Sequence, residues 1–274
     1  MTARTWLVTG CSTGFGRALA EVLLERGERV AITARRPETL ADLAAAYPET
    51  ALALRLDVTR QDEVEAAVAA TRARFGAIDV LVNNAGYGGI GTVEETDPEM
   101  ARAMMETHYF GTIAMVRAVV TEMRERGSGQ IVNIGSVAGQ IGFPALGYYC
   151  ASKFALAGLT EALANELRLA GVRVTLAELG PFATDFTANM RFNAPAFPEY
   201  DMAELTRHAG NAGWGAGDPA RAGAEALLAA LADPEPPVRL VLGQAGLDVV
   251  ELHDARRAAE RAQWLPLTRL EGFV

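Results

Sequence analysis

Seven short apolar segments alternate with longer helical segments along this chain, and this alternation constrains the fold more than any other feature of the sequence. The segments are apolar throughout, which is typical of strands in a sheet that is covered on both faces. Strands joined by helices of this length form parallel sheets through right-handed crossovers. The predicted strands lie in residues 5–10, 29–34, 51–58, 78–86, 129–136, 172–179 and 237–243.

The sequence therefore predicts an α/β fold: one Rossmann-like, doubly wound sheet of about seven parallel strands, with helices on both faces. The chain has 274 residues, which suits one large domain with a substantial core. The predicted helices include one long helical tract over residues 98–126, another over 149–170 and a last one over 247–264. The segment after residue 180 is rich in aromatic residues and proline, and a loop this long in a compact domain is usually functional.

Composition and charge argue against several classes of function. The net charge of −9 argues against a nucleic-acid or anionic-membrane partner. The two cysteines, Cys11 and Cys150, form neither a disulfide framework nor a metal site, so we expect no metal. The amino terminus lacks the features of a signal peptide, and no apolar run reaches the ~20 residues that cross a bilayer, so we expect a cytoplasmic protein.

A glycine cluster joins the first predicted strand to the first predicted helix. Gly10, Gly14 and Gly16 lie where the chain turns, and glycine lets a backbone approach a ligand closely. The free N–H groups of a helix start can hold a pyrophosphate, so this turn is a candidate dinucleotide site. Glycines that serve only the tight turn are the alternative.

The end of the second predicted strand bears on the choice of cofactor. An NAD site usually has a carboxylate here, which binds the ribose 2′-hydroxyl, whereas this chain has Arg35 and Arg36. Guanidinium groups bind phosphate, so the pair favours a 2′-phosphate and NADP(H), with Arg35 as the stronger candidate. NAD(H) remains possible if both arginines are ordinary surface charges.

Two adjacent tyrosines begin the helix predicted over residues 149–170. Tyr149 has Lys153 four residues later, on the same helical face, whereas Tyr148 has Ser152 there. A nearby ammonium, together with the positive charge of a nicotinamide, would stabilise a phenolate and lower its pKa, so Tyr149 is the candidate general acid. Most isolated Tyr-x-x-x-Lys sequences are ordinary amphipathic helix.

Together these motifs resemble the short-chain dehydrogenase/reductase family, from Thr5 to about Gly243. The resemblance rests on Thr9 with the three glycines, on "NNAG" at Asn83–Gly86, and on Ser136, thirteen residues before Tyr149. It implies hydride transfer from a nicotinamide, with Ser136, Tyr149 and Lys153 catalytic, and a homodimer or homotetramer. The branch that it resembles most includes hydroxysteroid and retinol dehydrogenases and bacterial ketoreductases. The cofactor residues implied are Gly10, Ser12, Thr13, Phe15, Gly16, Arg35, Arg36, Asp57, Val58, Asn84, Ala85, Gly86, Tyr149, Lys153, Phe182 and Thr184.

His108 is the clearest departure from the family pattern. Many members have an asparagine at this position, where it helps to hold a water that relays protons to the lysine. A histidine could substitute as a catalytic relay, with a pH dependence of its own. The alternative is a neutral ring packed between helices.

The substrate expected from this resemblance is a small, largely apolar ketone, aldehyde or alcohol. The predicted substrate residues are Ser136, Gly142, Phe143, Tyr149 and Phe186. Apart from Arg191, the predicted substrate segments lack the cations that a carboxylate or phosphate would need. We expect residues 1–274 to form one NADP(H)-binding catalytic domain, with 182–215 as a substrate loop or lid and 244–274 as a carboxyl-terminal helix and tail. A non-catalytic dinucleotide sensor, an NAD-dependent alcohol dehydrogenase, and an epimerase or dehydratase are the alternative functions.

Overall fold

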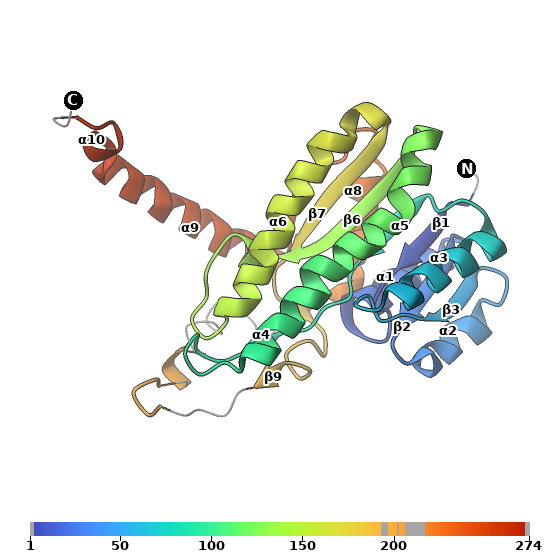
Figure 1. The fold of residues 1–274 in the computed structure, drawn as a ribbon, viewed down its shortest axis with the longest axis horizontal. Coiled ribbons are helices and arrows are strands. Elements are labelled where there is room, and N and C mark those ends of the chain that lie inside the picture. Colours follow the sequence, from blue (N-terminus) through green and yellow to red (C-terminus); the bar gives the residue numbers. More distant parts are fainter. Residues whose placement is uncertain (1–2, 193–196, 202, 206–216, 272–274) are drawn as a thin grey trace.

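Seven parallel strands form the central sheet of the protein, in the order β11-β7-β6-β4-β1-β2-β3 (Figure 1). The computed structural model describes residues 3–192, 197–201, 203–205 and 217–271. The predicted strands are confirmed within a few residues. Their bounds are β1 Thr5–Val8, β2 Arg29–Ala34, β3 Ala51–Arg55, β4 Val80–Asn83, β6 Gly129–Ser136, β7 Val172–Leu179 and β11 Arg239–Leu242.

Helices cover both faces of this sheet, as the uniformly apolar strands predict. One hydrophobic core joins the sheet to α3, α5 and the end of α6, and another joins it to α1 and α8 (Figure 1). The helices are α1 Gly14–Glu25, α2 Ala41–Ala46, α3 Gln61–Phe75, α4 Pro98–Met105, α5 Gly111–Arg126, α6 Gly147–Leu167, α8 Ala220–Leu231, α9 Gln244–Gln263 and α10 Leu265–Thr268.

The helical tract predicted over residues 98–126 is interrupted. The side chain of Asp97 accepts the backbone N–H of Glu99 and caps α4, while Gly127 ends α5 in a left-handed conformation with φ of 70°. Between the two helices, residues Glu106–Phe110 form a π-helical turn. Turns of this kind often occur at functional sites, and this one carries His108.

Two small parallel sheets connect the segment after β7 to the rest of the domain. β8 (Phe182–Ala183) pairs with β10 (Asp218–Pro219), and β5 (Gly89–Ile90) pairs with β9 (Arg191–Phe192). The predicted loop or lid over residues 182–215 lies partly outside the described residues, which omit 193–196, 202 and 206–216.

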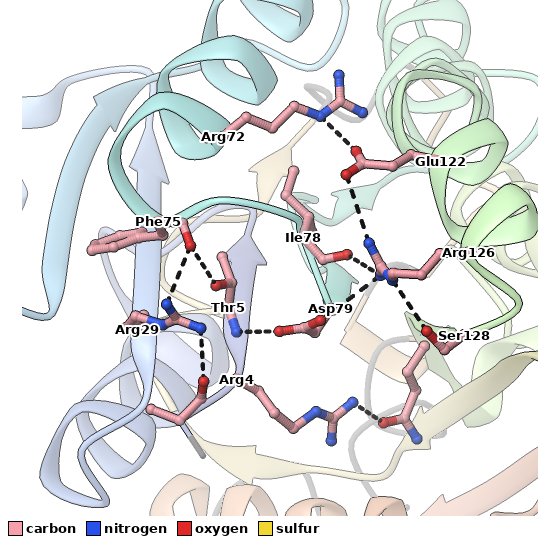
Figure 2. Close-up of polar contacts among 12 residues, drawn as sticks. Arg4, Thr5, Arg29, Arg72, Phe75, Ile78, Asp79, Glu122, Arg126 and Ser128 are labelled. Carbon is pink, nitrogen blue, oxygen red and sulfur yellow. Dashed lines mark hydrogen bonds and ion pairs between the residues drawn. The ribbon is translucent and has the colours of Figure 1, made fainter.

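The two edges of the central sheet differ in character. At the amino-terminal edge, polar contacts tie the strand starts together: the N–H of Thr5 donates to Asp79 at 2.8 Å, and Arg126 donates to the carbonyl of Ile78 at 2.9 Å (Figure 2). At the carboxyl edge, the order in which strands are added reverses between β1 and β4, because β2 and β3 lie on one side of β1 and the later strands lie on the other. Ligands of open α/β sheets bind at such a switch point.

Candidate active site

A cavity of about 690 Å³ opens at the carboxyl edge of the sheet. This volume is within the range of small-molecule sites. Most of the predicted site residues line it, although they come from segments far apart in the sequence. These residues are Gly10, Ser12, Thr13, Phe15, Arg35, Asp57, Val58, Asn84, Ala85, Gly86, Ser136, Tyr149, Lys153, Phe182, Thr184 and Phe186.

The glycine turn between β1 and α1 has the shape that a phosphate cradle needs. Gly10 and Gly14 have positive φ, of 72° and 65°. A Cβ atom at Gly16 would lie only 2.2 Å from the side-chain nitrogen of Asn84, so this position requires glycine. The side chain of Thr13 does not cap α1, which leaves the N–H groups of its first turn for a ligand. These features fit the pyrophosphate of a dinucleotide.

The "NNAG" segment is held directly against this turn. The hydroxyl of Thr9 accepts the N–H groups of Asn84 and Ala85, both at 2.9 Å. In return, the Asn84 amide donates to the carbonyls of Thr9 and Gly10, at 2.9 and 3.0 Å. Thr9 and Asn84 therefore fix two loops that both line the cavity.

The ends of β2 and β3 form the wall that carries the predicted 2′-phosphate residues. Arg35 is exposed, lines the cavity and has no ion pair among the described residues. Asp57 is engaged by Thr59, whose N–H and hydroxyl donate to the carboxylate at 3.0 and 2.7 Å. Arg36 is exposed and lies outside the lining residues, so of the two predicted arginines only Arg35 faces the site.

Ser136, Tyr149 and Lys153 come together at the buried floor of the cavity. Ser136 ends β6, and its hydroxyl is placed so that hydrogen bonding lowers the pKa of Tyr149. The ammonium of Lys153 donates to the carbonyl of Ile134 at 2.9 Å and lies 6.0 Å from the centre of the Tyr149 ring. Tyr148 instead donates its hydroxyl to the carbonyl of Val93 at 3.3 Å and is absent from the lining.

Burial dominates the electrostatics of the floor. Burial raises the pKa of Tyr149 well above its ordinary value, and the hydrogen bond with Ser136 opposes this only in part. Burial also lowers the pKa of Lys153 to about 8. The lowered pKa predicted for the Tyr149 phenol is therefore not a property of these side chains alone, because burial outweighs the hydrogen bond with Ser136.

The lysine predicts a pH dependence of stability. Its pKa falls from 10.5 to about 8 on folding, so between these values the unfolded chain binds more protons than the folded chain. The contribution of Lys153 to stability therefore rises from pH 8 to pH 10.5. Lys153→Met removes this titration. The difference in the free energy of unfolding, wild type minus variant, should therefore increase by about 3 kcal/mol across this pH range. Denaturant unfolding at a series of pH values measures the difference, and parallel pH curves would contradict it.

His108 lies behind the cavity wall, with both ring nitrogens engaged. Its Nε2 accepts the backbone N–H of Tyr87 at 3.1 Å, so the proton is on Nδ1, which lies 2.8 Å from the Ser152 hydroxyl. Ser152 in turn donates to the carbonyl of Tyr149 at 2.7 Å. Burial, together with the charge of Lys153, holds the pKa of His108 well below its usual value. This geometry favours the neutral packed ring over the proton relay.

Two predicted substrate residues do not reach the cavity. Gly142 is exposed, and Phe143 packs in two hydrophobic clusters, one with Tyr149 and the other with Val250 on α9. Phe186 does reach it, with its ring centre 5.9 Å from that of Tyr149. Gly16 also lies outside the lining, because its role is to let Asn84 approach.

Sequence reasoning missed several residues that line the cavity. Tyr87 could have been found, since it directly follows the "NNAG" motif. The others lie on segments whose position depends on the tertiary fold. The missed residues include Tyr87, Thr107 and Val249, whereas Asn189 and Arg191 lie on the predicted substrate loop of residues 182–215.

Metal-ligating clusters and membrane-spanning helices are both absent from the described residues. Those residues contain no group of three histidine, cysteine, aspartate or glutamate side chains that could hold a metal ion. No helix within them is long and apolar enough to cross a membrane.

Comparisons with known proteins identify the family. The family described as short chain dehydrogenase matches residues 4–194. The chain is 35% identical to the oxidoreductase BOA17 of Botryotinia fuckeliana over 94% of this chain and 93% of that protein. A short-chain dehydrogenase structure from Streptomyces avermitilis matches with a TM-score of 0.90 and 40% identity, covering 98% of both chains.

Similar structures hold either nicotinamide cofactor. One from Burkholderia cenocepacia, in complex with NADP, has a TM-score of 0.75 and 29% identity over 96% of this chain and 98% of that one. One from Burkholderia phymatum, in complex with NAD, has a TM-score of 0.81 and 26% identity over 97% and 95%. The chain therefore belongs to the short-chain dehydrogenase family of oxidoreductases.

Proposed function

We propose that the protein is an NADP(H)-dependent oxidoreductase that interconverts a largely apolar ketone or aldehyde and its alcohol. The observation that carries this proposal is the convergence of Ser136, Tyr149 and Lys153 on the buried floor of a cavity whose other end is the glycine turn. Residues 1–274 would act as one catalytic domain, with 182–215 as the substrate loop and 244–274 as an appended helix and tail.

The chain's own residues would manage the proton while the bound nicotinamide supplies or accepts a hydride. The Tyr149 hydroxyl would give its proton to the substrate oxygen in reduction and take it back in oxidation. Ser136 would donate a second hydrogen bond to that oxygen and stabilise its developing charge. Lys153 would bind the nicotinamide ribose hydroxyls and stabilise the phenolate left on Tyr149. Its own pKa of about 8 keeps much of it protonated near neutral pH.

The preference for NADP(H) over NAD(H) rests on Arg35. Its side chain lines the cavity beyond the end of β2, where an NAD site would usually have a carboxylate. An exposed guanidinium without an ion pair among the described residues suits a 2′-phosphate. An NAD-dependent alcohol dehydrogenase is the second candidate, because similar structures hold either cofactor.

An apolar substrate is supported by the walls around Tyr149. Phe186, Leu179, Val137 and Val249 contribute aromatic or aliphatic surface to the cavity. The one cation on the predicted substrate segments, Arg191, lies 4.5 Å from the centre of the Tyr87 ring in a cation–π contact. A ring-containing ketone would find stacking partners here, whereas a carboxylate would have to compete for Arg191.

His108 would act as a positioning residue, because one nitrogen bonds the cofactor loop at Tyr87 and the other bonds α6 through Ser152. Asparagine and glutamine can each replace one of these contacts. His108→Asn can still donate to Ser152, so kcat should stay within about threefold of the wild type while the Kd for NADPH rises about tenfold. His108→Gln can still accept the hydrogen bond from the backbone N–H of Tyr87. Its Kd for NADPH should therefore stay near the wild-type value while kcat falls about tenfold.

Steady-state kinetics give kcat, and fluorescence titration gives the Kd for NADPH, for the wild type and both variants across a pH series. All three proteins should share one pH profile, because a neutral ring does not titrate in the working range. A shifted profile in His108→Asn would instead support the proton relay. If kcat and the affinity for NADPH fell equally in both variants, the contacts of His108 with Tyr87 and Ser152 would not have separate roles.

The proposal is tested by a screen of aryl ketones, aldehydes, steroids and long-chain alcohols with NADPH, NADH and their oxidised forms. Absorbance of the reduced nicotinamide reports turnover. Faster turnover with an apolar ketone and NADPH supports the proposal. Cofactor binding without turnover of any compound favours the non-catalytic sensor, which the intact Tyr149 and Lys153 argue against.

A further inference from the structure

The carboxyl-terminal helices α9 and α10 form an arm that leaves the body of the protein (Figure 1). Of the 20 residues of α9, only Gly246 and Val250 are buried, and both belong to the first two turns. At 1.5 Å per residue the helix is about 30 Å long, so most of it extends beyond the domain. We call residues 244–271, which include α9 and α10, the arm.

A helix with no tertiary contacts is marginal in water at this length, because most helical stability in proteins comes from packing one face. The arm also exposes large apolar side chains: Leu252, Trp264, Leu267 and Leu270 are 54%, 51%, 48% and 59% exposed. Its outer part, residues 256–271, is net positive, with Arg256, Arg257, Arg261 and Arg269 against Glu260 and Glu271, whereas Asp248, Glu251 and Asp254 lie nearer the body. The arm therefore needs a partner surface that is both apolar and acidic.

The segments that follow β5 and β9, residues 93–102 and 197–201, form such a surface, which we call the acidic rim. Val93, Phe197 and Tyr200 are exposed there. Two contacts bring the two segments of the rim together: the Tyr200 hydroxyl donates to Glu94 at 2.9 Å, and the N–H of Phe197 donates to Glu95 at 2.9 Å. Exposed carboxylates surround these groups, with Arg102 as an exposed cation on α4 beside them. The exposed carboxylates of this acidic rim are Glu94, Asp97, Glu99, Glu199 and Asp201.

We propose that the arm docks on the acidic rim of a second copy of this chain. The arm cannot reach its own rim, because it points away from α4 and β9 (Figure 1). In a twofold dimer each subunit would place its arm on the acidic rim of the other, and each arm would cover apolar and charged groups there. The net charge of −9 leaves the body of each copy acidic, so the basic outer arm is attracted to it.

Charge reversal on the full-length chain tests this contact. Arg257→Glu with Arg261→Glu reverses the arm, and Glu99→Arg with Glu199→Arg reverses the rim. Sedimentation velocity should show that each double variant dissociates to a smaller species, with the subunit Kd raised about tenfold or more. An equimolar mixture of the two variants should reassociate, because each arm then meets a rim of opposite charge.

Arg26→Glu with Arg168→Glu is the matched control, since it changes the charge equally at exposed positions of the body, and it should leave the assembly intact. Three results would overturn the proposal. These are a wild-type chain that sediments as a monomer, an arm variant that associates as the wild type does, and a mixture that fails to reassociate. A monomeric wild type would mean that the arm binds a different partner. An arm variant that associates normally would mean that other helices form the subunit interface.

Discussion

Tyr149→Phe is expected to lower kcat by about a thousandfold, within the range that general acid–base groups contribute. The change removes only the hydroxyl, and the ring keeps its edge contact with His108 at 5.8 Å between centres. The Kd for NADPH should therefore stay within about twofold of the wild type. Stopped-flow reduction of an aryl ketone gives the rate, and fluorescence titration of NADPH gives the Kd.

The neighbouring tyrosine supplies a matched control. Tyr148→Phe makes the same chemical change one residue away, but that hydroxyl donates to the carbonyl of Val93 outside the cavity lining. It should keep nearly full activity. Equal losses in the two variants, or a loss of NADPH binding that parallels the loss of turnover in Tyr149→Phe, would contradict the role of Tyr149 as proton donor.

Arg35→Asp is expected to reverse the preference between the two cofactors. Losing a charge-assisted bond to the 2′-phosphate should raise the Kd for NADPH about a hundredfold, and the new carboxylate repels that phosphate. The same carboxylate can accept a hydrogen bond from the ribose 2′-hydroxyl of NADH. The Kd for NADH should therefore stay at the wild-type value or fall. The ratio of the two Kd values, measured by calorimetry on one protein preparation, is the quantity that matters.

Arg36→Asp controls for the change in net charge. Arg36 is exposed and lies outside the cavity lining, so the ratio should move by only about threefold through solvent-screened repulsion. An unchanged ratio in Arg35→Asp would remove the basis for the NADP(H) preference. A larger effect at Arg36 than at Arg35 would show that Arg36, and not Arg35, binds the 2′-phosphate.

The sequence predicted those parts of the molecule that depend on local pattern. Uniformly apolar runs located the seven strands, and glycines at fixed spacing located the turn whose Gly16 approaches Asn84. Helical spacing distinguished Tyr149 from Tyr148, because a one-residue shift moves a side chain about 100° around the helix. The structure brings Ser136 and Lys153 to the same floor.

The remaining features depend on what surrounds each side chain in three dimensions. The pKa of Tyr149 follows from burial by several segments, which a lysine four residues away does not reveal. The state of His108 depends on Tyr87 and Ser152, which lie 21 and 44 residues away in the sequence. Phe143 is aromatic and close to the site in sequence, yet it packs beside α9 instead of lining the cavity.

Isotope transfer tests the central claim most directly. NADPH carrying deuterium at C4 of the nicotinamide, with each face labelled in a separate reaction, is mixed with the protein and an aryl ketone. Mass spectrometry of the product should find deuterium on the carbinol carbon from one face only, and none should appear with Tyr149→Phe on the same timescale. A protein that binds NADPH but transfers no deuterium to any ketone, aldehyde or steroid tested would contradict the proposed oxidoreductase.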